Sequence, residues 1–288
     1  MSTDVIIQGE DIASADLRAL HAICSANGIE RIGYVAHQAF RLARANVESR
    51  EAVKKHCDAA QLDFAFVPSG RRLHAMGLLA MDMDSTLITI ECIDEIADFI
   101  GKKAEVAVVT ASAMRGEIDW PESLRRRVAL LAGLEESALQ RVYDERLALS
   151  PGADVLIATA KRAGIRTLLV SGGFTFFTER LKIRLGFDFS FSNTLEVVGG
   201  KLTGHVTGPL CDAPSKARHL RTARDKLGLR REQIVAIGDG ANDLQMMREA
   251  GLSVAYRAKP VVQAQAQAAI NFVGLDGVLA LFDETAKV

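Results

Sequence analysis

The sequence predicts an α/β protein whose core is a doubly wound, Rossmann-like parallel sheet with a helical cap, preceded by a small ferredoxin-like α+β domain. Three observations support this. From residue 71 onward, short apolar segments of strand length alternate with longer amphipathic ones, which is typical of a parallel sheet. A helical block without strand signals interrupts the alternation at about 88–150. Before residue 70 the order is strand, helix, strand, strand, helix, strand.

Residues 1–70 form the predicted ferredoxin-like domain. Its expected elements are a strand at 5–7, a helix capped by Ser14 or Asp16 and ended by Gly28, two strands within 29–42, a helix at 48–60 and a strand at 62–66. Pro68-Ser69-Gly70 is a plausible boundary because these residues favour turns. A packing or dimerisation module without a ligand, and hence a homodimer, is one interpretation of this domain.

Residues 71–288 form the predicted core with its inserted cap. The expected elements are a strand at 77–81, cap helices ended by Gly101 and Gly133, a helix at 153–163, a strand at 166–170, a helix at 174–185, a hairpin around Gly199-Gly200, a helix at 215–227, a strand at 234–237, and strand-and-helix units at 252–265 and 270–282. An insert between the first two core strands would stand over the ligand crevice as a lid.

Composition excludes several classes of protein. The chain has 288 residues, of which 49% are hydrophobic and 25% charged, and this is ordinary for a globular protein. A net charge of −1 argues against a nucleic-acid partner. No apolar stretch reaches membrane-spanning length and no basic segment with an apolar core begins the chain, so we expect a cytoplasmic protein without a membrane partner. The four cysteines lack the paired spacing of a zinc site or a disulfide framework.

Two carboxylates, Asp82 and Asp84, directly follow the first core strand. In open α/β sheets, ligands bind beyond the carboxyl ends of the strands. Residues two apart on an extended backbone share a face, so the two acids would crowd together. Their repulsion is relieved by a divalent cation, and Mg²⁺ favours a few carboxylates together with water and a substrate phosphate.

Three further segments carry polar groups, and they follow in order along the chain. Ser171-Gly172-Gly173 lies between a strand and a helix, where a hydroxyl and exposed amides suit a phosphate, although such a triplet is also a common turn. Lys216 lies near a helix start, where a lone lysine is usually solvated. The segment 238–243 is rich in acids, with an Asx-turn as the plain alternative.

Together these segments resemble the four motifs of the haloacid dehalogenase-like phosphatases. Asp82-Met83-Asp84-Ser85-Thr86 matches D-x-D-x-[ST], and Gly238-Asp239-Gly240-Ala241-Asn242-Asp243 matches G-D-G-x-N-D. The resemblance implies that Asp82 is a nucleophile forming an aspartyl-phosphate, and that Asp84 serves as general acid and then general base. Ser171 and Gly172 would hold phosphoryl oxygens, and Lys216 would neutralise charge on the phosphoryl group and on Asp82.

The same resemblance implies a Mg²⁺ site. Its ligands would be the Asp82 carboxylate, the Asp84 main-chain carbonyl and Asp239. Asp243 would bind through water or support a ligand, and Asn242 would contact the substrate or hold the neighbouring acids.

Within this superfamily the chain looks most like the phosphoserine phosphatases. Glu91 follows the first motif at their spacing, and the segment from Met114 to Val128 matches their M-x-G-x-x-x-F-x-x-[SA]-L-x-x-R-V pattern, with Trp120 in the Phe position. The resemblance implies hydrolysis of O-phospho-L-serine to L-serine and phosphate, the last step of serine biosynthesis. Glu91 would meet the substrate ammonium and Arg127 its carboxylate. Residues 1–70 are similar to the ACT-like domains that precede some of these enzymes.

Other functions stay open from the sequence alone. A phosphatase or a phosphotransferase acting on another small phospho-metabolite shares all four motifs. A regulatory protein that senses an amino acid through its first domain, with an inactive core, is the alternative from another class. Dehalogenases lack the second acid, whereas Asp84 is present here.

Overall fold

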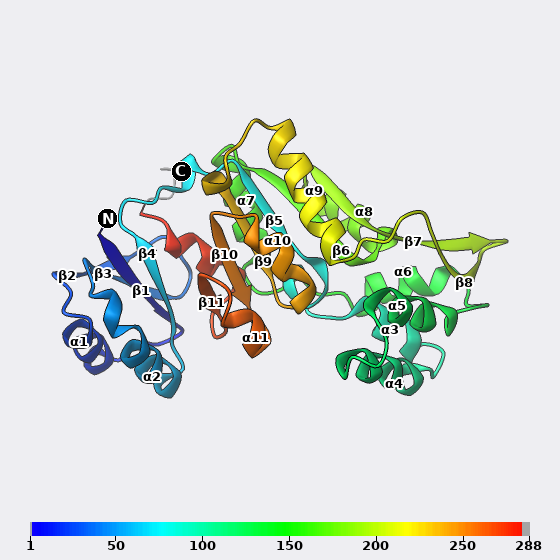
Figure 1. Ribbon diagram of the computed structural model, residues 1–288, viewed down its shortest axis with the longest axis horizontal. Helices are drawn as coiled ribbons and strands as arrows, with labels where there is room; N and C mark the ends of the chain where they lie inside the picture. The colour runs from blue at the N-terminus through cyan, green and yellow to red at the C-terminus, as the bar shows by residue number, and fades with distance from the viewer. Residues whose placement is uncertain (1, 284–288) are drawn as a thin grey trace.

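The computed structural model describes residues 2–283, so 284–288 of the predicted core lie outside the described residues. A four-stranded antiparallel sheet, ordered β2-β3-β1-β4, comes first in the chain (Figure 1). Its elements are β1 (Thr3–Gly9), α1 (Ser14–Ile23), β2 (Gly28–Ile32), β3 (Gln38–Ala43), α2 (Arg50–Ala60) and β4 (Asp63–Pro68). The element order and the strand order are those of a ferredoxin-like fold, so this part of the fold prediction is confirmed.

Two local predictions in this part are wrong. The residue before α1 is Ala13, and no side chain caps the helix, so neither Ser14 nor Asp16 has that role. The helix ends at Ile23, and the chain then turns at Ser25, whose φ of 47° is left-handed. Gly28 therefore begins β2 instead of ending α1. Ser25, a polar residue in the left-handed region, turns the chain after α1, which is the role that we predicted for Gly28.

The second sheet has seven strands in the order β11-β10-β9-β5-β6-β7-β8. Its strands are β5 (Leu78–Met81), β6 (Arg166–Phe174), β7 (Phe189–Val198), β8 (Lys201–Thr207), β9 (Ile234–Gly238), β10 (Leu252–Tyr256) and β11 (Ala268–Ile270). All neighbours run parallel except β7 and β8, which form the predicted hairpin. The chain builds from β5 to one side and then crosses to β9 on the other, so a topological switch point lies beside β5.

Helices cover both faces of this sheet. They are α7 (Ala153–Arg162), α8 (Thr175–Leu185), α9 (Ala213–Lys226), α10 (Leu244–Arg248) and α11 (Pro260–Gln263). The four residues of β5 are all buried, and they alternate between two apolar clusters. Leu79 and Met81 pack in the cluster that includes residues of α7 and α8, whereas Leu78 and Ala80 pack with residues of α9 and α10. The doubly wound α/β prediction is therefore confirmed.

The inserted block is helical, with α3 (Cys92–Asp98), α4 (Lys103–Met114), α5 (Trp120–Ala129) and α6 (Ser137–Glu145) set beside the sheet (Figure 1). Its two connections to the core bond to each other, because Thr89 N–H donates to the Ala148 carbonyl at 3.0 Å and Ser150 N–H to the Leu87 carbonyl at 2.9 Å. The hairpin also contacts it: Gly133 N–H donates to the Leu202 carbonyl at 2.8 Å. The cap is therefore held by the β7–β8 hairpin as well as by its two connections to the core. The cap sequence did not predict this contact.

Candidate active site

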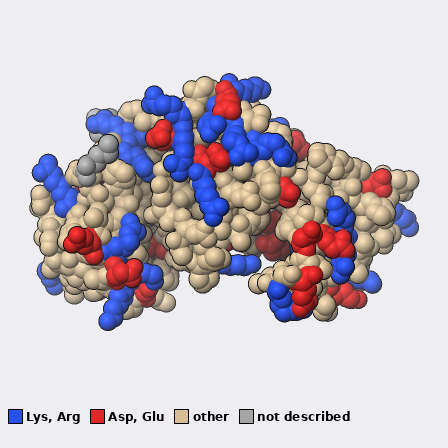
Figure 2. Space-filling view, viewed as in Figure 1, with Lys and Arg blue, Asp and Glu red and all other residues tan. Residues whose placement is uncertain are grey.

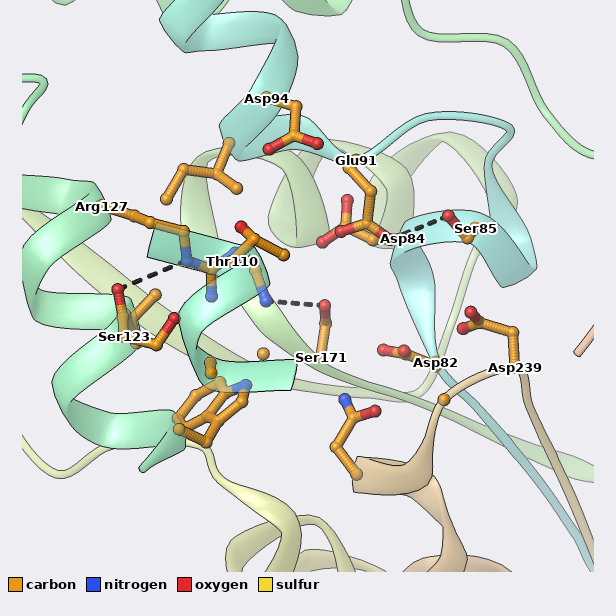
Figure 3. A pocket seen from close by; sticks show the side chains of 18 of the residues that line it. Asp82, Asp84, Ser85, Glu91, Asp94, Thr110, Ser123, Arg127, Ser171 and Asp239 are labelled. Atoms are coloured by element: carbon orange, nitrogen blue, oxygen red, sulfur yellow. Dashed lines mark hydrogen bonds between the residues drawn. The ribbon is translucent and has the colours of Figure 1, made fainter. Parts of the chain in front are cut away.

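The candidate site lies where the carboxyl ends of three adjacent strands meet. Asp82 follows β5, the segment 171–173 lies at the end of β6, and Asp239 follows β9. Met81 pairs with Leu169 on one side and Ile237 on the other, which brings these ends together. A cavity of about 570 Å³ separates this edge of the sheet from the cap helices (Figure 3).

The two acids of the first motif are held by backbone amides. Asp82 Oδ1 accepts from Met83 N–H at 2.8 Å, and Asp82 N–H donates to the Ile237 carbonyl at 3.1 Å. Asp84 Oδ1 accepts from Cys92 N–H at 3.1 Å, at the first residue of α3. Burial raises the pKa of both carboxyls. The position of Asp84 is therefore fixed by the cap as well as by the core.

Lys216 reaches the site from the first turn of α9. That helix begins at a polar cap, because Asp212 Oδ1 accepts from Ser215 N–H at 2.9 Å. The Lys216 ammonium is fully buried and lies 2.8 Å from Asp82 Oδ1 and 2.7 Å from Asp243 Oδ1. Burial opposes its charge, but the carboxylates of Asp243 and Asp82 outweigh burial and raise the Lys216 pKa. It therefore stays a cation beside Asp82.

Carboxylates outnumber cations at this edge. Oxygens of Asp82, Asp239 and Asp243 all lie within 4.8 Å of one another. Asp239 also accepts from the Thr86 hydroxyl at 3.2 Å, and burial, followed by the Asp243 charge, raises its pKa to about 7. Such a set of hard oxygen donors with one lysine fits a divalent cation, which would relieve the remaining repulsion.

The segment that carries Asp239 turns tightly. A Cβ on Gly238 would lie 2.5 Å from the Asp243 carboxyl carbon, so only glycine admits that side chain. Gly240 N–H donates to Asp243 Oδ2 at 3.1 Å. Both oxygens of Asp243 thus have protein partners, and Asn242 lines the cavity in front of it.

The segment at the end of β6 differs from our expectation. We expected the strand to end at residue 170 with a turn after it, but β6 continues to Phe174 with a break in register after Val170. The Ser171 hydroxyl oxygen accepts from Gly173 N–H at 2.9 Å inside this irregular stretch. A Cβ on Gly173 would lie 2.5 Å from Asp84 Oδ2, so a glycine here lets the acid approach.

The opposite wall of the cavity comes from the cap (Figure 3). Glu91 Oε1 accepts from the Ser85 hydroxyl at 2.8 Å, and Arg127 Nε donates to the Ser123 carbonyl at 3.4 Å. Glu91 remains open to solvent, yet desolvation by the surrounding walls, followed by the Asp84 charge, raises its pKa to about 7. The Ser123 hydroxyl is buried without a hydrogen-bond partner among the described residues.

The structure brings the predicted site residues together in two layers. The cavity is lined by Asp82, Asp84, Glu91, Arg127, Ser171, Gly172, Asp239 and Asn242. Lys216 and Asp243 lie behind Asp82, in contact with it or with each other.

Sequence reasoning missed four residues of or near this site: Asp94, Thr110, Lys259 and Asn193. Asp94 lies on α3 beside the buried residues Ile93 and Ala97, so the helical period could have found it. Thr110 lies on α4, whose apolar residues are spread around the helix, so the period gives no signal for it. Asn193 lies on β7 in the apolar register, between Phe191 and Leu195, so this polar interruption of the two-residue alternation could have found it.

Comparison with known proteins agrees with this geometry. Residues 79–248 match the family model of the haloacid dehalogenase-like hydrolases, so the chain belongs to that family. Residues 5–53 match a model described only as a domain of unknown function, DUF4072.

Similar proteins of known name identify the family within the haloacid dehalogenase-like hydrolases to which the chain belongs. The phosphoserine phosphatase of Polaromonas sp. strain JS666 is 54% identical over 73% of this chain and 91% of its own. The chain therefore belongs to the phosphoserine phosphatase family within the larger class. A crystal structure of a probable phosphoserine phosphatase from Vibrio cholerae has a TM-score of 0.83 at 40% identity, covering 96% of this chain and 85% of its own.

Similarity also extends over the whole chain. A haloacid dehalogenase family hydrolase from Salmonella enterica serovar Typhi has a TM-score of 0.89 at 32% identity and covers 99% of both chains. In residues 2–283, no helix has the length and apolar character needed to cross a bilayer.

Proposed function

We propose that this chain hydrolyses O-phospho-L-serine to L-serine and phosphate through a phosphorylated Asp82. The observation that carries the proposal is one cavity with two unlike ends. Asp82, paired with a buried lysine, lies at the core end, and Glu91 and Arg127 lie at the cap end. A phosphomonoester that also carries an ammonium and a carboxylate matches both ends.

Asp82 is suited to act as the nucleophile. Burial and the charge of Asp243 raise its pKa, but Lys216 at 2.8 Å favours the ionised form. One carboxylate oxygen would attack phosphorus as the ester P–O bond breaks, giving an aspartyl-phosphate and the serine alkoxide. In the protonated form that burial favours, Asp84 would give its proton to that alkoxide.

The second half of the reaction returns the enzyme to its starting state. Asp84, now ionised, would accept a proton from a water molecule that attacks the phosphorus of the aspartyl-phosphate. The bond from phosphorus to the Asp82 oxygen breaks, and inorganic phosphate leaves. During both halves, the Ser171 hydroxyl, the Gly172 N–H and Lys216 would offset charge on the phosphoryl oxygens, while Asn242 contacts the substrate.

We further propose Mg²⁺ as the cofactor. The Asp82 and Asp239 carboxylates and the Asp84 main-chain carbonyl would hold it, with Asp243 supporting Asp82 and Lys216 from behind. When bound, the ion would polarise a phosphoryl oxygen and offset negative charge that one lysine cannot balance. The acidic cluster within 4.8 Å supports this assignment.

Recognition of the amino acid would fall to the cap. The Glu91 carboxylate would bind the substrate ammonium, and the Arg127 guanidinium would bind the carboxylate with two parallel hydrogen bonds. Arg127 already faces the acidic side of the pocket, where burial lowers its pKa while Asp94 and Glu91 oppose that effect. A substrate carboxylate would offset the positive charge of the Arg127 guanidinium.

We also propose the biological setting. Four buried, unpaired cysteines fit a reducing compartment such as the cytoplasm, where the reaction would complete serine biosynthesis. We propose that residues 1–70 are an ACT-like domain, that 71–288 are the phosphatase core with a cap at about 88–150, and that the chain forms a homodimer. Light scattering of the purified protein tests the homodimer.

The test of the function is phosphate release from a panel of phosphomonoesters, with Mg²⁺ and with EDTA. We expect phosphoserine to be the best substrate and EDTA to abolish turnover. No release from any substrate would favour the inactive, amino-acid-sensing alternative. Better turnover of another phospho-metabolite would favour a phosphatase with a different substrate. Phosphoryl transfer to added homoserine would favour a phosphotransferase.

A further inference from the structure

Asn193, on β7, is a buried polar residue that none of the four motifs contains. It is 1% exposed and lies opposite Phe174 of β6. Its Nδ2 donates to the Gly172 carbonyl at 2.7 Å, and its Oδ1 accepts from Cys211 N–H at 2.8 Å. These two partners fix the orientation of the amide, because a carbonyl requires a donor and an N–H requires an acceptor.

The first bond acts on the phosphate-binding end of the cavity. In a trans peptide the carbonyl and the following N–H point in opposite directions, so holding the Gly172 carbonyl sets the direction of Gly173 N–H. That N–H donates to Ser171 Oγ at 2.9 Å. Because the hydroxyl oxygen already accepts a bond there, its own proton is available for an acceptor in the cavity that Ser171 lines.

The second bond acts on the helix that carries the lysine. Cys211 immediately precedes Asp212, the residue that caps α9, and Lys216 lies in the first turn of that helix. Asn193 therefore bridges the segment that would hold phosphoryl oxygens and the helix that delivers the cation to Asp82. The two segments belong to different strand-helix units, and the Asn193 amide forms a hydrogen bond with each segment.

We propose that Asn193 is a positioning residue for the phosphoryl-transfer site. It sets the Gly172–Gly173 peptide so that the Ser171 hydroxyl donates toward a phosphoryl oxygen, and it holds α9 in register with that peptide. This proposal rests on the proposed function of the site, since it assigns a phosphoryl group to the cavity.

The variant Asn193→Asp should break the hydrogen bond to the Gly172 carbonyl while keeping the one from Cys211 N–H. The carboxylate keeps an oxygen for Cys211 N–H but presents a second oxygen to the Gly172 carbonyl, which repels it. At low pH the protonated carboxyl donates to that carbonyl again, and burial raises the pKa at which this occurs. The neighbouring Cys211 thiol does not interfere, because burial raises its pKa to about 11.

The experiment measures kcat and the inhibition constant of inorganic phosphate for wild type and Asn193→Asp between pH 5.5 and pH 8. At pH 8 we expect kcat to fall and the phosphate constant to rise, each by about 10-fold or more. Expressed as a ratio to wild type at each pH, both deficits should shrink toward pH 5.5. Partial unfolding alone would lower kcat but leave the phosphate constant unchanged.

Asn46→Asp is the matched control. Asn46 is exposed, and among residues 2–283 its side chain bonds only through the oxygen, which accepts from Glu48 N–H at 3.0 Å, so the aspartate should keep wild-type values at every pH. If Asn193→Asp does not fold, Asn193→Ala removes the amide donor and acceptor without burying a charge. Wild-type constants in whichever of these two variants folds, or a deficit in Asn193→Asp that does not change with pH, would overturn the proposal.

The outcome stays separate from that of the proposed function. Should wild type release no phosphate from phosphoserine, calorimetric titration of inorganic phosphate into wild type and Asn193→Asp still tests the inference. Weaker phosphate binding by the variant at pH 8, recovering at pH 5.5, supports it. Equal binding contradicts it.

Discussion

The two ends of the cavity are built differently. At the core end, Lys216 and Asp243 are fully buried and Asp82 is nearly so, and their charged atoms lie within 2.8 Å of a partner. At the cap end, Glu91 is open to solvent and Arg127 is half-buried. The core end has a fixed geometry before any ligand arrives, whereas the cap end offers groups that a ligand would order. Phosphoryl chemistry and substrate choice would therefore respond separately to mutation.

The largest effect is expected at the nucleophile. Asp82→Asn removes the attacking oxygen but keeps the shape and the amide contact to Met83, so kcat should fall by about 10³-fold or more with every substrate. Steady-state phosphate release measures this, and circular dichroism checks that the fold is retained. Residual turnover close to wild type would contradict the role of Asp82.

Lys216→Met tests the cation behind the nucleophile. Two buried carboxylates would lose their common partner, which costs about 3–5 kcal/mol of unfolding free energy when both stay ionised. The loss should grow as the pH rises, because low pH allows Asp82, whose pKa burial raises, to take up a proton. Thermal unfolding with and without Mg²⁺ measures this, and Mg²⁺ should stabilise the variant more than wild type. Wild-type stability at pH 8 would show that the pairing matters little.

Arg127→Ala addresses the cap end alone. A charge-assisted hydrogen bond contributes about 1.5–3 kcal/mol, so KM for phosphoserine should rise about 10- to 100-fold while kcat changes little. Phosphoethanolamine lacks the carboxylate and should keep its KM. Arg125→Ala, at an exposed position of the same helix, is the control. Equal losses on both substrates would argue against a carboxylate clamp.

The pH dependence of KM for phosphoserine should reveal the contribution of Glu91, which lies at the cap end of the cavity. Its pKa of about 7 means that the carboxylate is ionised above pH 7 and protonated below it. A protonated Glu91 cannot attract an ammonium, so KM for phosphoserine should rise by roughly tenfold from pH 8 to pH 6. In Glu91→Gln this dependence should flatten. Phosphoglycolate, which has no ammonium, controls for titration of the phosphate, and a pH dependence as steep as that of phosphoserine would refute the assignment.

Trp120→Phe should have the smallest effect. The ring lies against Gly172, where an added Cβ would come within 2.9 Å of it, so the indole closes the cap over the core. Phenylalanine keeps the apolar contact with less volume, and such changes usually cost under about 1.5 kcal/mol. We expect less than about tenfold change in KM. A loss as large as that of Arg127→Ala would mean that the indole contacts substrate directly.

The core end was predictable because its residues lie in short, contiguous motifs at strand ends. A parallel sheet places the ends of β5, β6 and β9 at one edge, which is why Asp82, Ser171 and Asp239 were expected there. That these three strands are neighbours is seen only in the strand order of the structure. Their roles stay predictions, since geometry shows proximity and not reactivity. The pairing of Lys216 with Asp243 was not predicted, because only the packing of α9 determines which carboxylate the ammonium reaches.

Other features had no local signal. The bonding partners of Asn193 could not be predicted, because they are 21 and 18 residues away along the chain. Helix ends were also misjudged, because Ser25 adopts the left-handed turn that we expected of Gly28. The contact between Gly133 and the hairpin involves Leu202, which lies 69 residues further along the chain, so the cap sequence could not reveal it.

The central claim is that Asp82 carries the phosphoryl group during turnover. Acid quenching of the enzyme with phosphoserine in the steady state, followed by peptide mass spectrometry, tests it most directly. We predict one added phosphoryl group on the peptide that contains Asp82, absent from Asp82→Asn and lost on exposure to base. Phosphorylation of another residue, or no phosphorylation of wild type quenched during turnover at saturating phosphoserine, would contradict the account.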